Sequence, residues 1–220
     1  MSLDELTYRA RPPEGEAEAL LVLLHGRGAD ENDLFSLFEL LDPRRRMLCL
    51  TPRGPLSLPP GGAHWYVVRA VGYPDPDTFH PTFERLERWL DAAVEDAGLP
   101  HERVLVGGFS QGCVMAYALA LSAARPQPAG VAAFSGFLPT VDGLELDLAG
   151  RSSLRVAIGH GVHDPIIGVE WGRDARARLE GAGAEVLYQE SPMPHSIDPR
   201  FAARAGAWLD AGLRGGAPAN

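Results

Sequence analysis

The stretch VLVGGFSQGCVMAYALAL, residues 104–121, passes from a strand-like apolar segment directly into a segment of helical character. Ser110 stands at the junction, with Gly108 two positions before it and Gly112 two positions after it. A G-x-S-x-G turn between a strand and a helix presents a serine hydroxyl on a strained backbone, beside the unpaired N–H groups of the helix start. Serine also commonly caps helices, but the two glycines and the preceding strand favour a nucleophile.

Short apolar runs alternate with amphipathic stretches on both sides of this junction. The runs are too uniformly apolar for a sheet with one wet face. We therefore predict an α/β fold, with a mostly parallel central sheet and helices on both faces. The predicted strands are 19–26, 46–52, 103–109, 130–136, 154–160 and 184–190, and the predicted helices are 30–41, 78–97, 111–124, 167–181 and 196–213.

The length of 220 residues, 45% of them hydrophobic, suits one substantial core. We expect a single domain over residues 19–213, preceded by an N-terminal segment, 1–18, with an edge strand, and followed by a flexible tail, 214–220. The Pro- and Gly-rich insert 51–77 is too long and too aromatic for a simple linker, and loops of this size are often functional.

Charge and cysteine content exclude several partners and compartments. The formal net charge is -9, and the basic residues are all arginine, scattered except for Arg44–Arg46, which argues against nucleic-acid binding. Cys49 and Cys113 lie in apolar surroundings that indicate reduced core thiols. No signal segment or long apolar run is visible, so we expect a cytoplasmic protein without integral membrane association. The oligomeric state stays open, with a homodimer among the alternatives.

A serine hydroxyl becomes a nucleophile only when a base takes its proton and a carboxylate orients that base. Asp164 follows the predicted strand 154–160, and His195 follows the strand 184–190. Ligands bind beyond the carboxyl ends of the strands in such sheets, and the order Ser, Asp, His is typical of α/β-hydrolases. We predict Ser110, Asp164 and His195 as the catalytic residues.

His160, His163 and Asp164 form an H-x-x-H-D pattern that offers three potential metal ligands. No second cluster completes this set except His195, which the catalytic role requires. We expect neither a metal nor a cofactor, and assign His160 and His163 to shaping the Asp164 loop.

Five segments in order resemble the phospholipase/carboxylesterase family of small α/β-hydrolases, which includes acyl-protein thioesterases: LHGRGAD (24–30), GFSQGC (108–113), FSGFLP (134–139), GHGVHDPII (159–167) and His195. The resemblance spans about residues 19–210. It implies a serine esterase that hydrolyses carboxylic esters or thioesters, of a small molecule or a lipid, through an acyl-enzyme. Two alternatives remain: a non-catalytic ligand-binding protein on the same scaffold, and an acyltransferase.

The resemblance also assigns the oxyanion hole to the backbone N–H groups of Arg27 and Gln111, and makes His25 a structural brace. Two residues depart from the family pattern. Arg27 replaces a residue that is more often apolar. Its cation either favours acidic substrates or extends into water, and we prefer the second interpretation. Pro194 precedes His195 where the family often has glycine, which leaves the conformation of that loop open.

An ester substrate needs an apolar trough beside the polar centre. The candidates near the predicted carboxyl-end loops include Phe35, Trp65, Ile166 and Met193. Trp65 is the preferred one, because the segment around HWY matches an aromatic segment that lines the cleft in the family. Acyl length and the choice between oxygen ester and thioester stay open.

Overall fold

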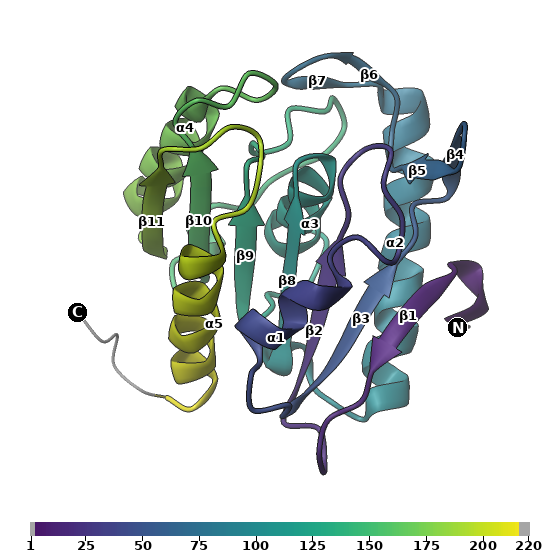
Figure 1. The fold of residues 1–220 in the computed structure, drawn as a ribbon, viewed down its shortest axis with the longest axis vertical. Helices are drawn as coiled ribbons and strands as arrows, with labels where there is room; N and C mark the ends of the chain where they lie inside the picture. Colours follow the sequence, from purple (N-terminus) through teal and green to yellow (C-terminus); the bar gives the residue numbers. More distant parts are fainter. Residues whose placement is uncertain (1–2, 216–220) are drawn as a thin grey trace.

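A seven-stranded sheet forms the centre of the computed structural model, which describes residues 3–215 (Figure 1). The strand order is β1-β3-β2-β8-β9-β10-β11, and only the edge strand β1 runs antiparallel to its neighbour. The prediction of a mostly parallel sheet is confirmed. The strands are β1 Tyr8–Arg11, β2 Ala19–Leu24, β3 Met47–Pro52, β8 Val104–Phe109, β9 Gly130–Phe134, β10 Arg155–Gly161 and β11 Glu185–Ser191.

Helices cover both faces of the sheet, and alternate residues of each central strand face one layer or the other. Helices α2, α3 and α4 pack with Leu20, Val22 and Val106 on one face, whereas α1 and α5 pack with Leu21 and Leu23 on the opposite face (Figure 1). Because helices cover both faces of the sheet, the side chains on both faces are buried, and the strands are apolar throughout. The helices are α1 Phe38–Leu41, α2 Pro76–Ala97, α3 Gln111–Leu121, α4 Val169–Gly181 and α5 Pro199–Leu213.

Helix α3, which follows Ser110, is buried along its whole length. A helix that is apolar on every side requires a protein interior, and here β8 and β9 lie against it while α2 covers it. The burial holds the N-terminus of α3 rigidly at the carboxyl end of β8.

The segment 30–41, predicted as one helix, is mostly not α-helical. Asp30 accepts hydrogen bonds from the backbone N–H and side-chain amide of Asn32, and this local turn competes with helical bonding. A short 3₁₀ helix, η2 Phe35–Leu37, leads into α1, so the α-helix is confined to Phe38–Leu41. The other predicted helices are present, with ends displaced by a few residues.

The insert 51–77 forms two small antiparallel hairpins beside the carboxyl ends of the strands (Figure 1). The second hairpin lies over Trp171, whose ring occupies the space that a side chain at Gly72 would need. The Thr140 hydroxyl donates to the Gly72 carbonyl and ties the hairpin turn to the loop after β9. These elements are β4 Leu56–Leu58, β5 Gly62–His64, β6 Val68–Ala70 and β7 Tyr73–Pro74; the remaining 3₁₀ helices are η1 Leu3–Glu5, η3 His101–Arg103 and η4 Ala149–Arg151.

Both cysteines are buried as free thiols, on opposite faces of the sheet. Burial raises the pKa of the Cys49 thiol to about 12, so it stays protonated at neutral pH. Within residues 3–215, no helix has both the length and the apolar character needed to cross a bilayer. Most of the predicted tail, 216–220, lies outside the described residues.

Candidate active site

Ser110 lies at a sharp turn between β8 and α3, with φ 55° and ψ -119°. A Cβ on Gly108 would lie 2.5 Å from the Gly112 carbonyl, and a Cβ on Gly112 would lie 2.0 Å from the Leu24 carbonyl oxygen. Both distances are far below contact, so only glycine fits at either position. The G-x-S-x-G pattern is therefore a steric requirement of this turn, and it brings the serine hydroxyl to the carboxyl end of the sheet.

Ser110, His195 and Asp164 form one hydrogen-bonded chain, although 85 and 31 residues separate the linked pairs. His195 Nε2 lies 2.9 Å from Ser110 Oγ, and His195 Nδ1 lies 2.6 Å from Asp164 Oδ2. A proton on Nδ1 is donated to the carboxylate, which leaves Nε2 as the acceptor for the serine hydroxyl. The Phe109 ring packs 4.6 Å from the imidazole, centre to centre, and limits its rotation.

The Asp164 carboxylate is held by the backbone of its own loop. Its Oδ1 accepts from the N–H groups of Ile166 and Ile167 at 2.8 and 2.9 Å, which turns Oδ2 toward His195. His160 Nε2, on β10, donates to the Ile167 carbonyl at 2.8 Å and so holds the same loop against the end of the strand. His163 is exposed, and its backbone N–H binds the Met193 carbonyl, so the Asp164 loop is tied to the His195 loop.

Asp198 closes the loop that carries His195. Its carboxylate accepts from the Ser191 hydroxyl at 2.6 Å, where β11 ends, and from the Arg200 N–H at 2.9 Å, where α5 begins. The hydrogen bond from the Ser191 hydroxyl holds the pKa of the Asp198 carboxyl below its usual value, so this carboxylate is ionised at neutral pH. The loop is thus closed at its base whatever the effect of Pro194.

Two backbone N–H groups beside Ser110 are free to bind an oxyanion. The Gln111 N–H belongs to the first turn of α3, and the Arg27 N–H has no hydrogen bond within the described residues. His25 braces the Arg27 loop: Nε2 accepts from the Gly54 N–H at 2.9 Å, and Nδ1 lies 2.7 Å from the Gly26 carbonyl. Burial lowers the pKa of His25, which keeps this imidazole neutral and able to accept.

The Gln111 side chain joins the nucleophile turn to the insert, a role that the sequence analysis missed. Its Oε1 accepts from the Trp65 N–H and its Nε2 donates to the Tyr66 carbonyl, each at 2.7 Å. The Trp65 indole N–H donates to the His25 carbonyl at 2.9 Å. Gln111 begins an apolar helical segment, where a glutamine side chain is buried and needs hydrogen-bond partners. That position was the signal available in the sequence.

A cavity of about 390 Å³, called here the Ser110 cavity, opens beside the hydroxyl. Its size falls in the range of about 300–1,000 Å³ that is usual for small-molecule sites. Its walls are mainly apolar and come from the β6–β7 hairpin and the loops after β9 and β10. The lining residues are Arg27, Tyr66, Val68, Ala70, Val71, Ser110, Gln111, Phe137, Ile166 and Ile167.

Of the four predicted substrate-binding residues, Ile166 lines this cavity and is 57% exposed. Trp65 is 0% exposed and acts as scaffold, so Tyr66 is the lining residue of the HWY segment. Phe35 does not line the cavity, because its ring packs on Phe38 and under the Arg9 guanidinium. Met193 does not line it either, and its backbone serves the loop contacts described above.

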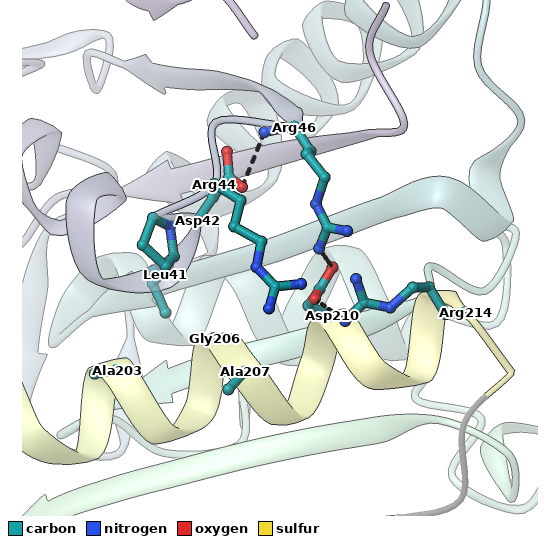
Figure 2. A pocket seen from close by; sticks show the side chains of 10 residues that line it. Leu41, Asp42, Arg44, Arg46, Ala203, Gly206, Ala207, Asp210 and Arg214 are labelled. Atoms are coloured by element: carbon teal, nitrogen blue, oxygen red, sulfur yellow. Dashed lines mark hydrogen bonds and ion pairs between the residues drawn. The ribbon is translucent and has the colours of Figure 1, made fainter. Parts of the chain in front are cut away.

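A second concave region lies near the amino end of β3, between α5 and the loop before β3 (Figure 2). This region, the α5 hollow, has a volume of about 170 Å³ and contains Arg44, Arg46 and Arg214. Figure 2 shows Arg46 and Arg214 meeting at Asp210, where both guanidiniums donate to the carboxylate. Two of the three arginines in the α5 hollow are therefore paired with a carboxylate of the protein itself.

The chain is similar to known proteins over most of its length. The sequence profile described as Phospholipase/Carboxylesterase matches residues 8–211. Acyl-protein thioesterase 1 of Debaryomyces hansenii is 26% identical over 214 residues, with 88% of this chain and 91% of the yeast protein covered. The putative hydrolase MhqD of Bacillus subtilis is 30% identical, with 89% and 94% covered. The Bacillus cereus carboxylesterase structure superposes with a TM-score of 0.80 at 24% identity, covering 94% of each chain.

Proposed function

The chain belongs to the phospholipase/carboxylesterase family of hydrolases, and on that premise we propose that it is a serine hydrolase of carboxylic esters and thioesters, working through an acyl-enzyme. The single observation that carries the proposal is the hydrogen-bonded chain from Ser110 Oγ through His195 to Asp164. Nucleophile, base and orienting carboxylate are the three parts that acyl transfer to serine requires.

In the first half-reaction, Ser110 Oγ attacks the carbonyl carbon while its proton passes to His195 Nε2, 2.9 Å away. Asp164 stabilises the imidazolium that forms and fixes its orientation. The carbonyl oxygen becomes an oxyanion, to which the N–H groups of Arg27 and Gln111 donate. His195 then protonates the leaving alcohol or thiol as the carbonyl reforms, and the acyl group stays on Ser110.

In the second half-reaction, a water molecule takes the place of the leaving group. His195 accepts a proton from the water, whose oxygen attacks the acyl carbon. Collapse of this intermediate breaks the bond to Ser110 Oγ, which regains its proton from His195, and releases a carboxylic acid. The enzyme returns to its starting state without a cofactor.

The lining of the Ser110 cavity supports a substrate with an apolar part. Val68, Val71 and Ile166 contribute aliphatic side chains to the cavity that Ser110 also lines. Thioesters are included because the leaving group departs toward His195, and a thiol is a better leaving group than an alcohol. The name of the yeast relative agrees with this extension.

The test is turnover of p-nitrophenyl butyrate by the wild-type chain and by Ser110→Ala, with circular dichroism to verify that both are folded. We expect release of nitrophenol by the wild type and a loss of at least about 10³-fold in the variant. Retained turnover in the variant would refute the assignment of Ser110.

A fluorophosphonate probe provides a second measurement with an internal control. We expect peptide mapping to find the label on Ser110 and not on Ser135, which also has a positive φ at the end of a strand but whose hydroxyl has no hydrogen-bond partner within the described residues. Binding of an ester without release of its alcohol would instead indicate a ligand-binding protein. Product partitioning on addition of alcohols would indicate an acyltransferase.

A further inference from the structure

We propose that Arg27 makes the Ser110 cavity selective for esters that carry an anionic group, a carboxylate or a phosphate, a few bonds from the reacting carbonyl. This inference rests on the proposed function and adds a substrate class to it. It identifies Arg27 as a specificity-determining residue through its side chain, separately from its backbone N–H.

The charge distribution around the cavity is the first observation. Among the described residues that line it, Arg27 is the only one with a full charge. Its side chain is exposed, and within residues 3–215 its guanidinium has no hydrogen bond, ion pair or ring contact. Arginine presents five donors in a planar fork that fits carboxylate and phosphate oxygens, so this group is free to bind an anion.

The neighbouring arginines are engaged elsewhere. Arg53 lies 3.1 Å from Glu31 and 3.5 Å from Asp30, and Arg69 of β6 pairs with Asp75. The Asp164 side chain is 0% exposed, is bound to His195, and does not line the cavity. A substrate anion in the cavity therefore meets one unpaired cation and no exposed carboxylate from the lining.

The place of Arg27 in the loop sets the position of the anion along the substrate. In the proposed mechanism its N–H binds the oxyanion, and its exposed side chain belongs to the same residue of the cavity lining. A group that binds the guanidinium must therefore lie close to the carbonyl that binds the N–H. Half-esters of short dicarboxylic acids have this spacing between ester and carboxylate.

The formal net charge of -9 makes the selectivity a local effect. The protein as a whole repels anions at long range, and this repulsion is screened by salt beyond about 10 Å at 0.1 M. A preference for anionic esters would consequently depend on Arg27 itself and not on the overall charge.

The experiment compares kcat/KM for mono-p-nitrophenyl glutarate with that for its neutral methyl ester, in the wild type and in Arg27→Gln. We expect the wild type to prefer the anionic ester by about five- to tenfold at low ionic strength. In Arg27→Gln we expect this ratio to fall to about one or below. The ratio is taken within one variant, so any change in oxyanion binding by the backbone N–H of residue 27 affects both esters and cancels. A p-nitrophenyl ester whose acyl chain ends in a phosphate in place of the carboxylate distinguishes phosphate from carboxylate recognition.

Arg44→Gln is the matched control, because it removes the same charge from an exposed arginine of the α5 hollow. An equal ratio in the wild type and Arg27→Gln, or an equal loss in Arg44→Gln, would overturn the inference. Binding of monomethyl glutarate to Ser110→Ala, measured by calorimetry, is a readout without turnover. We expect binding to weaken at least fivefold when Arg27→Gln is added. If the neutral ester is not hydrolysed, the proposed function fails, whereas this binding difference still decides the role of Arg27.

Discussion

Arginine occurs in both concave regions described above, the Ser110 cavity and the α5 hollow, but it meets different neighbours in each. In the α5 hollow, Arg46 and Arg214 share the Asp210 carboxylate, and Arg46 also approaches Glu18 at 3.8 Å. In the Ser110 cavity, Arg27 has apolar neighbours and no partner within the described residues. Arg46 joins the loop before β3 to α5, Arg214 pairs with Asp210 one turn earlier in the chain, and Arg44 is exposed without a partner among the described residues. Arg27 differs from all three because it lines the cavity that contains Ser110.

Concavity and charge therefore do not by themselves identify a ligand site in this protein. The α5 hollow has more cations but is smaller, at about 170 against 390 Å³. Arg46, Arg214 and Asp210 satisfy one another there. The Ser110 cavity contains the Ser110 hydroxyl, and the backbone N–H and guanidinium of Arg27 have no partner within the described residues. We therefore expect substitutions at the cavity to change rates and substitutions at the hollow to change stability.

Asp164→Asn should give the largest effect and tests the cavity side of the comparison. The amide can still accept from the Ile166 and Ile167 N–H groups but favours the wrong tautomer of His195. We expect kcat for a neutral ester to fall by about four orders of magnitude with little change in KM. Steady-state kinetics on the folded variant measures this, and a loss below tenfold would remove Asp164 from the mechanism.

Gln111→Leu should change both the stability and the kinetics, because Gln111 lines the Ser110 cavity and also holds the insert. The change leaves the Trp65 N–H buried without its partner and removes one of the two hydrogen bonds to the Tyr66 carbonyl, which also lies 3.1 Å from His64 Nδ1. We expect the free energy of unfolding to fall by about 2–3 kcal/mol. KM should rise as well, because the insert that contributes Tyr66 to the cavity is loosened.

The matched control for that change is Gln127→Leu, which removes an exposed hydrogen bond to Ser153. Urea unfolding should show a change within about 0.5 kcal/mol there, and KM should stay constant. If both glutamine variants behave alike, the link between the insert and the nucleophile turn has no energetic importance.

Asp210→Asn should give the smallest effect and tests the hollow side. It repeats the carboxylate-to-amide change of Asp164→Asn, but at a site whose role we consider structural. Loss of the ion pairs with Arg46 and Arg214 should lower the free energy of unfolding by about 0.5–1 kcal/mol, since both pairs are partly exposed. Chemical denaturation measures this change. Turnover should be unaffected, and a marked loss of activity would mean that the α5 hollow communicates with the cavity.

The predictable part of the site follows from local rules. The alternation of apolar runs and amphipathic stretches anticipated the parallel strands of the sheet, because burial on both faces leaves a clear trace in composition. The loops that carry Asp164 and His195 were predictable as well, since each follows a strand that ends at the same edge. The segment 30–41 was not, because one Asx turn at Asp30 outweighed its helical periodicity.

Loop side chains were the part that sequence reasoning handled worst. Trp65 and Tyr66 are adjacent aromatic residues, and composition cannot say which one faces a cavity. The Gln111 side chain decides this by binding the backbone of both, which turns Trp65 into the core and Tyr66 toward the substrate space.

The turn at Ser110 was readable from the amino-acid sequence alone, because neighbouring backbone leaves no room for a side chain at Gly108 or Gly112. Only the tertiary structure decided which distant groups meet that serine and which charges remain unpaired beside it. Such contacts depend on how loops from separate strands pack against one another, and hydrogen bonds between loops leave no periodic trace along the chain.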